Sequence, residues 1–279
     1  MNNAEKTQLL LRRTMAALGS YRTDVVFIGG FAKTFYRHLS GFRDHGLVSQ
    51  ATLDVDLALP EPLLLRENST LHHRLEDQGL RRYVGLGLDN RPAYHRYHLM
   101  EDGIERPAIV HLEFIVPLRG PDRLTPGQPQ ANLLAHALRF IDLLQDRPVT
   151  VIEPEFGDLR LPHPLAYAIQ KTRIWRDRQP DKAQRDQADS FYVILAFQAD
   201  WTAWRDEWLR LSEHRHEWAQ WLAVTQQRWR DLYRTVDSPG CRIVALITGM
   251  DPRAVHRIMA DFLVVVCPSE TAANRSSPG

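Results

Sequence analysis

Cysteine is scarce in this chain of 279 residues, which has only Cys241 and Cys267. So few thiols do not indicate a disulfide framework and exclude a zinc site built mainly from cysteines. Long apolar runs are missing too, because the run at 262–267 is far shorter than the ~20 residues that span a bilayer. Residues 1–18 read as an amphipathic helix and lack the layout of a signal peptide. We therefore expect no contact with a membrane and a cytoplasmic location.

The chain also lacks a large excess of positive or negative charge. The chain has 35 basic and 34 acidic residues and a formal net charge of +1, which excludes a wholly basic nucleic-acid-binding coat but leaves a local basic groove open. Only four of the basic residues are lysines. In so arginine-rich a chain, lysine marks positions that need a compact point charge. Lys33, Lys171 and Lys182 are therefore candidates for binding an anionic group.

The pattern of hydrophobic residues changes from mixed to helical along the chain. We expect strands at 24–30, 52–60, 81–86, 94–100, 108–118 and 149–162, with helices at 4–18, 31–39, 63–79 and 131–144 and a linker at 117–130. Further helices are expected at 165–177, 181–198, 200–211, 214–235 and 252–266. This pattern predicts an α+β protein: a small mixed β-sheet core over 1–162, an α-helical domain over 163–267 and a disordered tail over 268–279.

Two aspartates lie inside an apolar strand. Asp54 and Asp56 are two residues apart, so their side chains project from the same face of the strand, while Val55 and Leu57 point to the other. Glu113 lies on the polar face of the strand at 108–118. If these strands are neighbours, three carboxylates converge, and their mutual repulsion then requires a cation. Hard oxygen ligands suit Mg²⁺. A solvated strand face is the other interpretation of an Asp-x-Asp pattern.

A pair of glycines follows the first strand. Gly29 and Gly30 come between a β-rich run and a helical segment, where glycine lets the backbone approach a phosphate closely. Alone, two glycines predict only a turn. The chain has neither the G-x-G-x-x-G of dinucleotide-binding folds nor a P-loop, and no G-x-S-x-G motif.

Residues 28–59, IGGFAKTFYRHLSGFRDHGLVSQATLDVDLAL, resemble the nucleotidyltransferase fold of the DNA polymerase β superfamily. The features that carry the resemblance are a Gly-Gly or Gly-Ser turn, a helix and then Asp-x-Asp. The similarity continues through residues 136–151 and 162–194. In particular, the chain resembles an uncharacterised bacterial branch of the superfamily that is related to AbiE-type toxin nucleotidyltransferases. Overall the similarity covers 24–198.

The resemblance implies a role for each matching residue. Asp54, Asp56 and Glu113 are expected to be catalytic and to bind two Mg²⁺ ions, with Mn²⁺ as a substitute. The expected nucleotide-binding residues are Gly29, Gly30, Lys33, Lys171, Lys182 and Asp186. Two positions depart from the family pattern, because Gly30 replaces a serine or threonine and Glu113 replaces an aspartate.

The expected activity is transfer of a nucleoside monophosphate from an NTP to a hydroxyl, releasing pyrophosphate. The acceptor stays open between the 3′ end of tRNA, as in a toxin held by a protein antitoxin, and a small molecule or protein. A non-catalytic nucleotide-binding or partner-binding scaffold of the same fold is the alternative.

Several other patterns are interpreted as structural. His111-Leu112-Glu113 matches the H-x-E of zinc deaminases, but the cysteines that such a site needs are absent. His72, His73, His214 and His216 lack the i, i+4 spacing of a helical zinc site and are expected to be solvated. Six of the seven tryptophans lie at 201–229, mostly at three- and four-residue intervals, which favours buried helix stripes over base stacking. They are Trp201, Trp204, Trp208, Trp218, Trp221 and Trp229.

Overall fold

The structure is a computed structural model that describes residues 2–47, 54–86, 92–99, 110–120, 127–175 and 178–267. The chain divides into two compact units, which we call the sheet unit (1–39 and 50–163) and the helical unit (40–49 and 164–279). The predicted boundary at 162 lies one residue from this division. Residues 40–49, which the predicted first domain includes, belong to the helical unit. The predicted tail at 268–279 lies outside the described residues.

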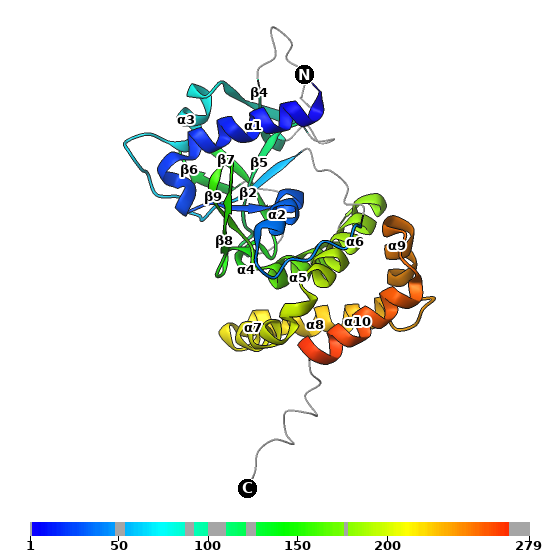
Figure 1. Cartoon of the computed structure of the whole chain (residues 1–279). Coiled ribbons are helices and arrows are strands. Elements are labelled where there is room, and N and C mark those ends of the chain that lie inside the picture. Colours follow the sequence, from blue (N-terminus) through cyan, green and yellow to red (C-terminus); the bar gives the residue numbers. More distant parts are fainter. Residues whose placement is uncertain are drawn as a thin grey trace. The chain divides into compact units, whose positions relative to one another are not determined.

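A seven-stranded mixed sheet forms the centre of the sheet unit (Figure 1). Along its main path the strands are β1 (Val26–Ile28), β2 (Val55–Ala58), β5 (Leu112–Pro117), β4 (Pro92–Leu99) and β3 (Leu80–Leu86). The central strand β5 is parallel to β2 and antiparallel to β4, and its second half pairs in parallel with β7 (Leu133–Leu138). With the helices that follow, this sheet confirms the predicted α+β class.

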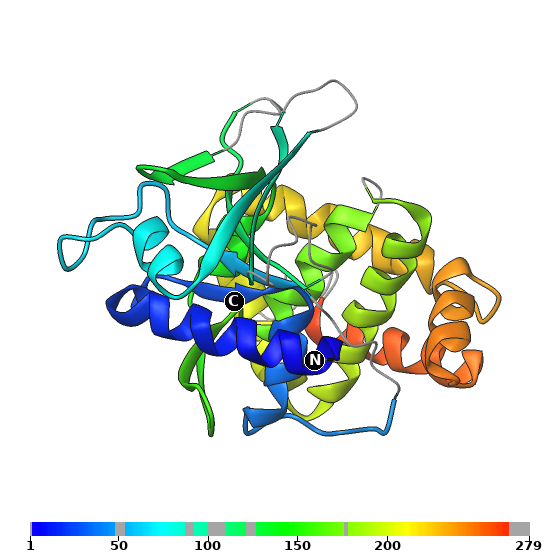
Figure 2. The same ribbon diagram turned by 90° about the horizontal axis from the view of Figure 1, so that it is seen from above.

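Short helices and a hairpin surround the sheet. The helices are α1 (Asn3–Leu18), α2 (Gly29–Phe35), α3 (Leu71–Asp77) and α4 (Ile141–Gln145), and β8 (Val149–Glu153) pairs with β9 (Gly157–Leu161). A capping box between Asn2 and Glu5 starts α1, since each side chain accepts from the other residue's backbone N–H. Helix α1 runs beside α3 (Figures 1 and 2). The predicted helix at 4–18 is thus confirmed.

The predicted helix at 63–79 is wrong over its first half, because only α3 is helical. Glu67 and Asn68 both have φ of 53°, a left-handed conformation that interrupts a right-handed helix. The helix starts only after Thr70, whose hydroxyl accepts from the backbone N–H of His73. His72 is buried rather than solvated, and its Nδ1 lies 2.8 Å from the Tyr97 hydroxyl.

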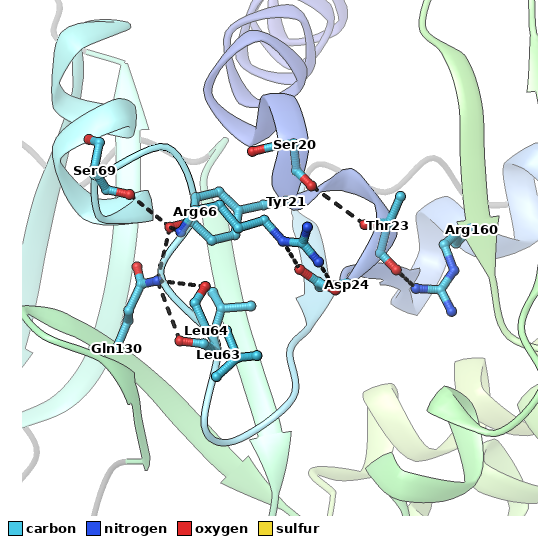
Figure 3. A network of polar contacts seen from close by, with 10 residues as sticks. All are labelled: Ser20, Tyr21, Thr23, Asp24, Leu63, Leu64, Arg66, Ser69, Gln130 and Arg160. Carbon is cyan, nitrogen blue, oxygen red and sulfur yellow. Dashed lines mark hydrogen bonds and ion pairs between the residues drawn. The ribbon is translucent and has the colours of Figure 1, made fainter.

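A buried tyrosine holds this loop in place (Figure 3). The Tyr21 hydroxyl accepts from the backbone N–H of Arg66 at 2.9 Å and from Gln130 Nε2 at 3.0 Å, and it donates to the Ser69 carbonyl at 2.7 Å. The Arg66 guanidinium binds both carboxylate oxygens of Asp24. Polar contacts therefore replace the missing helical hydrogen bonds of this segment.

Two further strands lie between β5 and α4, in segments that were predicted to be a linker and a helix. β6 (Gly127–Gln130) lies in the predicted linker, and β7 replaces the middle of the predicted helix at 131–144, of which only the end, in α4, is helical. Leu133 and Ala135 point to a buried face, alternating with less buried neighbours as a strand requires. Pairing with β5 overrides the helical spacing of the leucines. Phe140, with φ of 66°, then separates β7 from the short α4.

Six α-helices make up the described helical unit: α5 (Pro164–Ile174), α6 (Pro180–Ala196), α7 (Trp201–His214), α8 (His216–Leu232), α9 (Pro239–Thr248) and α10 (Pro252–Val266). Five correspond to predicted helices, and α9 was not predicted. Phe262 contacts the rings of Trp201, Trp204 and Trp229, all of them buried. The predicted buried stripes are thus confirmed for these tryptophans.

The segment 40–47 joins the helical unit through specific contacts. The Phe42 ring packs on Tyr192 and Phe197, and the backbone N–H of Arg43 donates to the Ala196 carbonyl at 2.8 Å. This segment therefore extends the helical unit with residues from the first quarter of the chain. None of the helices within the described ranges combines the length and apolar character needed to traverse a lipid bilayer.

Candidate functional site

The two aspartates of the Asp-x-Asp pattern stand at the start of β2. Val55 and Leu57, which alternate with them, are completely buried, so the carboxylates of Asp54 and Asp56 project from the opposite face. The Asp54 side chain is 45% exposed. A strand whose opposite face is apolar and buried thus presents two carboxylates on one face.

Glu113 lies beside them on the neighbouring strand. Asp56 and Glu113 are register partners of the parallel pair β2–β5, and Arg96 is the partner of Glu113 on β4. Residues directly opposite each other share a sheet face. Asp56, Glu113 and Arg96 therefore form one row across three strands, in which two acidic residues are followed by a basic one.

The Glu113 carboxylate has two basic partners. Its Oε1 lies 2.5 Å from Nε of Arg96 and 2.9 Å from Nε2 of His111. Burial favours the neutral acid, but the hydrogen bond from His111 and the charge of Arg96 outweigh it and lower the pKa of Glu113 to about 2. Glu113 is therefore an anion whose charge is already compensated by the protein.

His111 connects Glu113 to Asp54. Its Nδ1 lies 3.2 Å from Oδ1 of Asp54, so both ring nitrogens face a carboxylate oxygen, an arrangement that suits the doubly protonated ring. Burial disfavours the imidazolium, yet the hydrogen bond to Glu113 and the charge of Asp54 raise the pKa of His111. His111 was expected to have a structural role only. Its position two residues before Glu113, on the same strand face, was the signal that could have revealed it.

The glycine turn contacts the second aspartate. Gly29 has φ of 65°, and a methyl group added to its α-carbon would overlap Oδ2 of Asp56. Gly29 therefore provides both the left-handed backbone and the space that the carboxylate occupies. Gly30 follows in the first turn of α2, and Lys33, in its last turn, is 5% exposed.

The candidate residues of the helical unit include a buried ion pair. Nζ of Lys171 on α5 lies 2.5 Å from Oδ1 of Asp186 on α6, and Asp189 lies 4.0 Å from the same nitrogen. Arg178 approaches the second oxygen of Asp186 at 3.5 Å. Lys182 lies one turn before Asp186 on α6 and is exposed to solvent.

The carboxylates of the sheet unit suit a divalent cation whose other ligands are phosphate oxygens of a substrate. Over the described part of the chain, no three His, Cys, Asp or Glu side chains are arranged as a complete metal site. Mg²⁺ does not require one, since it commonly binds one or two carboxylates together with substrate phosphates. Asp54 and Asp56 satisfy that requirement, whereas the Glu113 carboxylate is already in contact with Arg96 and His111.

Comparison with known proteins assigns the chain to a family. Residues 7–212 match the model of a family described as nucleotidyltransferase. This range includes Asp54, Asp56 and Glu113 as well as α5 and α6. The curated proteins and the solved structures that were compared gave no significant match. Since the matched range is well over half of the chain, the protein belongs to this nucleotidyltransferase family.

Proposed function

We propose that the protein transfers a nucleoside monophosphate from an NTP to a hydroxyl acceptor with the help of Mg²⁺. The single observation behind this proposal is the pair of carboxylates on one face of β2, next to the Gly29 turn, in a chain of this family. In the proposed reaction the acceptor oxygen bonds to the α-phosphorus, the bond to the bridging oxygen breaks, and pyrophosphate leaves. The hydroxyl proton passes to solvent.

Asp54 and Asp56 are the residues proposed to hold the ion. When bound there, Mg²⁺ would compensate phosphate charge and lower the pKa of the attacking hydroxyl. The buried neighbours Val55 and Leu57 hold in place the strand backbone from which both carboxylates project. Rate acceleration would come mainly from positioning and from charge compensation.

The remaining candidate residues are proposed to act on the nucleotide. Gly29 and Gly30 would allow the backbone to approach phosphate oxygens, and Lys182 offers an exposed ammonium group. Lys171 is held by Asp186, so we propose that this pair fixes α5 against α6. Lys33, which is buried on α2, would support the glycine turn at the start of that helix.

An RNA 3′ hydroxyl is the acceptor that we propose to test first. The resemblance to toxin-related nucleotidyltransferases supports this choice, and a protein antitoxin would be the corresponding partner. Small molecules and proteins are the other acceptor classes. A scaffold that binds nucleotide without turnover would give no transfer to any of them.

The test is a transfer assay with the purified full-length chain, Mg²⁺ and α-³²P-labelled NTPs, offered total RNA, deproteinised small-molecule extract or protein extract. Label on one class, lost in Asp54→Asn and Asp56→Asn variants and in EDTA, supports the proposal and names the acceptor class. Label that does not depend on either aspartate would contradict it. Asp261→Asn, on the exposed surface of α10, is the control for removal of an acidic side chain.

A further inference from the structure

A chain of polar contacts crosses three strands of the sheet unit and ends at Asp54. It runs from Arg96 Nε to Glu113 Oε1 at 2.5 Å, from that oxygen to His111 Nε2 at 2.9 Å, and from His111 Nδ1 to Asp54 Oδ1 at 3.2 Å. The sheet register brings the four residues together, since β5 lies between β2 and β4. No sequence motif links Arg96 to the aspartates.

Exposure differs systematically along this chain of contacts. The Arg96 and Asp54 side chains at its ends are 30% and 45% exposed, whereas His111 and Glu113 in the middle are 7% and 18% exposed. The two middle residues are thus shielded by the protein, and one end is open to a ligand. Such an arrangement fixes the exposed carboxylate through a buried support.

The contacts of Glu113 argue against its binding a cation. A divalent cation on this carboxylate would lie close to the Arg96 guanidinium, and like charges at that separation repel. Glu113 Oε1 is already in contact with both Arg96 Nε and His111 Nε2. Glu113 can, however, orient the His111 ring, whose other nitrogen faces Asp54.

From this geometry we infer that Glu113 is a positioning residue that acts through His111 on Asp54, and that Arg96 anchors Glu113. The inference rests on the proposed function, in which Asp54 binds the ion. Hydrogen-bond partners behind a metal ligand, including those behind a ligating carboxylate, fix its orientation, and their loss commonly weakens metal affinity or activity 10–100-fold. His111 supports an aspartate ligand here in the same sense, with Glu113 behind it.

The test measures metal binding separately from turnover. Mn²⁺ affinity is titrated by electron paramagnetic resonance in the full-length protein with α,β-methylene ATP, which is not turned over. His111→Phe is expected to weaken Mn²⁺ binding about 10–100-fold. Glu113→Gln is expected to weaken it as well, but to have no further effect in the His111→Phe background. This lack of additivity is the signature of two residues that act in series.

Two further variants separate positioning from folding. Arg96→Met changes the end of the contact chain that is farthest from Asp54 and is expected to weaken Mn²⁺ binding in the wild-type background but not with His111→Phe. His72→Phe is the matched control, because His72 is another buried histidine of the sheet unit, and its ring contacts the Tyr97 hydroxyl and Glu76. It should leave Mn²⁺ affinity within twofold. In the transfer assay, His111→Phe should lower kcat more than it raises KM for NTP.

Each outcome has a distinct meaning. If Glu113→Gln weakens Mn²⁺ binding equally with and without His111, Glu113 binds the ion directly and the inference is wrong. An unchanged Mn²⁺ affinity in both His111→Phe and Arg96→Met also overturns it. If Asp54→Asn and Asp56→Asn bind Mn²⁺ and nucleotide as the wild type does, the proposed function itself fails. A His111→Phe chain that does not fold is replaced by His111→Gln, with the same expected pattern.

Discussion

Nζ of Lys171 lies 2.5 Å from Oδ1 of Asp186, and the two side chains are 10% and 8% exposed. The resemblance to the polymerase β superfamily assigned Lys171 to the triphosphate. The structure shows that its ammonium group is engaged in joining α5 to α6. A buried charge is stable only with such a partner, so the two residues depend on each other.

Replacement of one partner is therefore expected to be costly. Lys171→Met leaves Asp186 buried beside the more distant Arg178, and the free energy of unfolding of the helical unit should fall by about 3–5 kcal/mol. All seven tryptophans lie in this unit, so urea unfolding followed by tryptophan fluorescence reports on it directly. The double variant Lys171→Met/Asp186→Leu should recover most of the loss. A single variant as stable as the wild type would contradict a structural role for the pair.

The contact between Gly29 and Asp56 predicts a strong effect of one methyl group. Gly29→Ala forces a left-handed residue with a side chain, at about 1–2 kcal/mol, and displaces the Asp56 carboxylate. Misplacement of a catalytic group by about 1 Å can cost 100-fold in rate, so we expect a loss of about that size in the transfer assay.

Gly249→Ala is the matched control for this prediction. Gly249 ends α9 with φ of 76°, and nothing lies within 4 Å of an added methyl carbon. The control thus shares the backbone penalty without the displaced carboxylate, and its transfer rate should stay within twofold of the wild type. Equal losses in both variants would show that backbone strain alone, and not Asp56, explains the effect.

Local sequence periodicity was sufficient to predict the part of the candidate site that lies on β2. Alternation along β2 depends only on neighbouring residues, so the shared face of Asp54 and Asp56 could be predicted from the sequence. Arg96 could not, because its position opposite Glu113 depends on which strands pair and in what register. The same reason hid the function of His111 as a link between two carboxylates.

The errors in the predicted secondary structure have the same origin. Leucines at 134 and 138 have helical spacing, but the segment forms β7 because β5 offers an unpaired edge. Intrinsic preference is a weak predictor where such pairing is available. In the loop before α3, left-handed residues at 67 and 68 and the contacts of Tyr21 decide the conformation. Neither feature is visible in a hydrophobic pattern.

Glu113 predicts a defined dependence of stability on pH. Its pKa is about 2 in the folded protein, against an ordinary value of 4.5. The folded state therefore binds fewer protons than the unfolded state between these values, so the contribution of Glu113 is complete above pH 4.5 and is lost as the pH falls toward 2. Wild-type stability should fall more steeply over this window than that of Glu113→Gln.

Urea unfolding of both chains at pH 3, 4, 5 and 6, followed by far-ultraviolet circular dichroism, measures this difference. Arg96→Met should have an intermediate slope, since it removes one of the two groups that stabilise the carboxylate anion. Parallel curves for wild type and Glu113→Gln between pH 5 and 3 would mean that the contacts of Glu113 with Arg96 and His111 do not form in solution.

The Tyr21 hydroxyl makes three hydrogen bonds inside the sheet unit (Figure 3). Tyr21→Phe keeps the ring but leaves the Arg66 N–H and the Ser69 carbonyl without this partner. Unsatisfied groups of this kind cost about 1–3 kcal/mol each when they are buried, and these two are only partly buried, so we expect a total loss of about 2 kcal/mol.

Hydrogen exchange at the amides of 63–70 measures this loss, because the sheet unit contains no tryptophan. Tyr36→Phe, which removes a buried hydroxyl that donates to the Pro162 carbonyl outside this loop, should leave exchange in the loop unchanged. If Tyr21→Phe also leaves it unchanged, the loop before α3 is held by the Arg66–Asp24 ion pair and not by the buried hydroxyl.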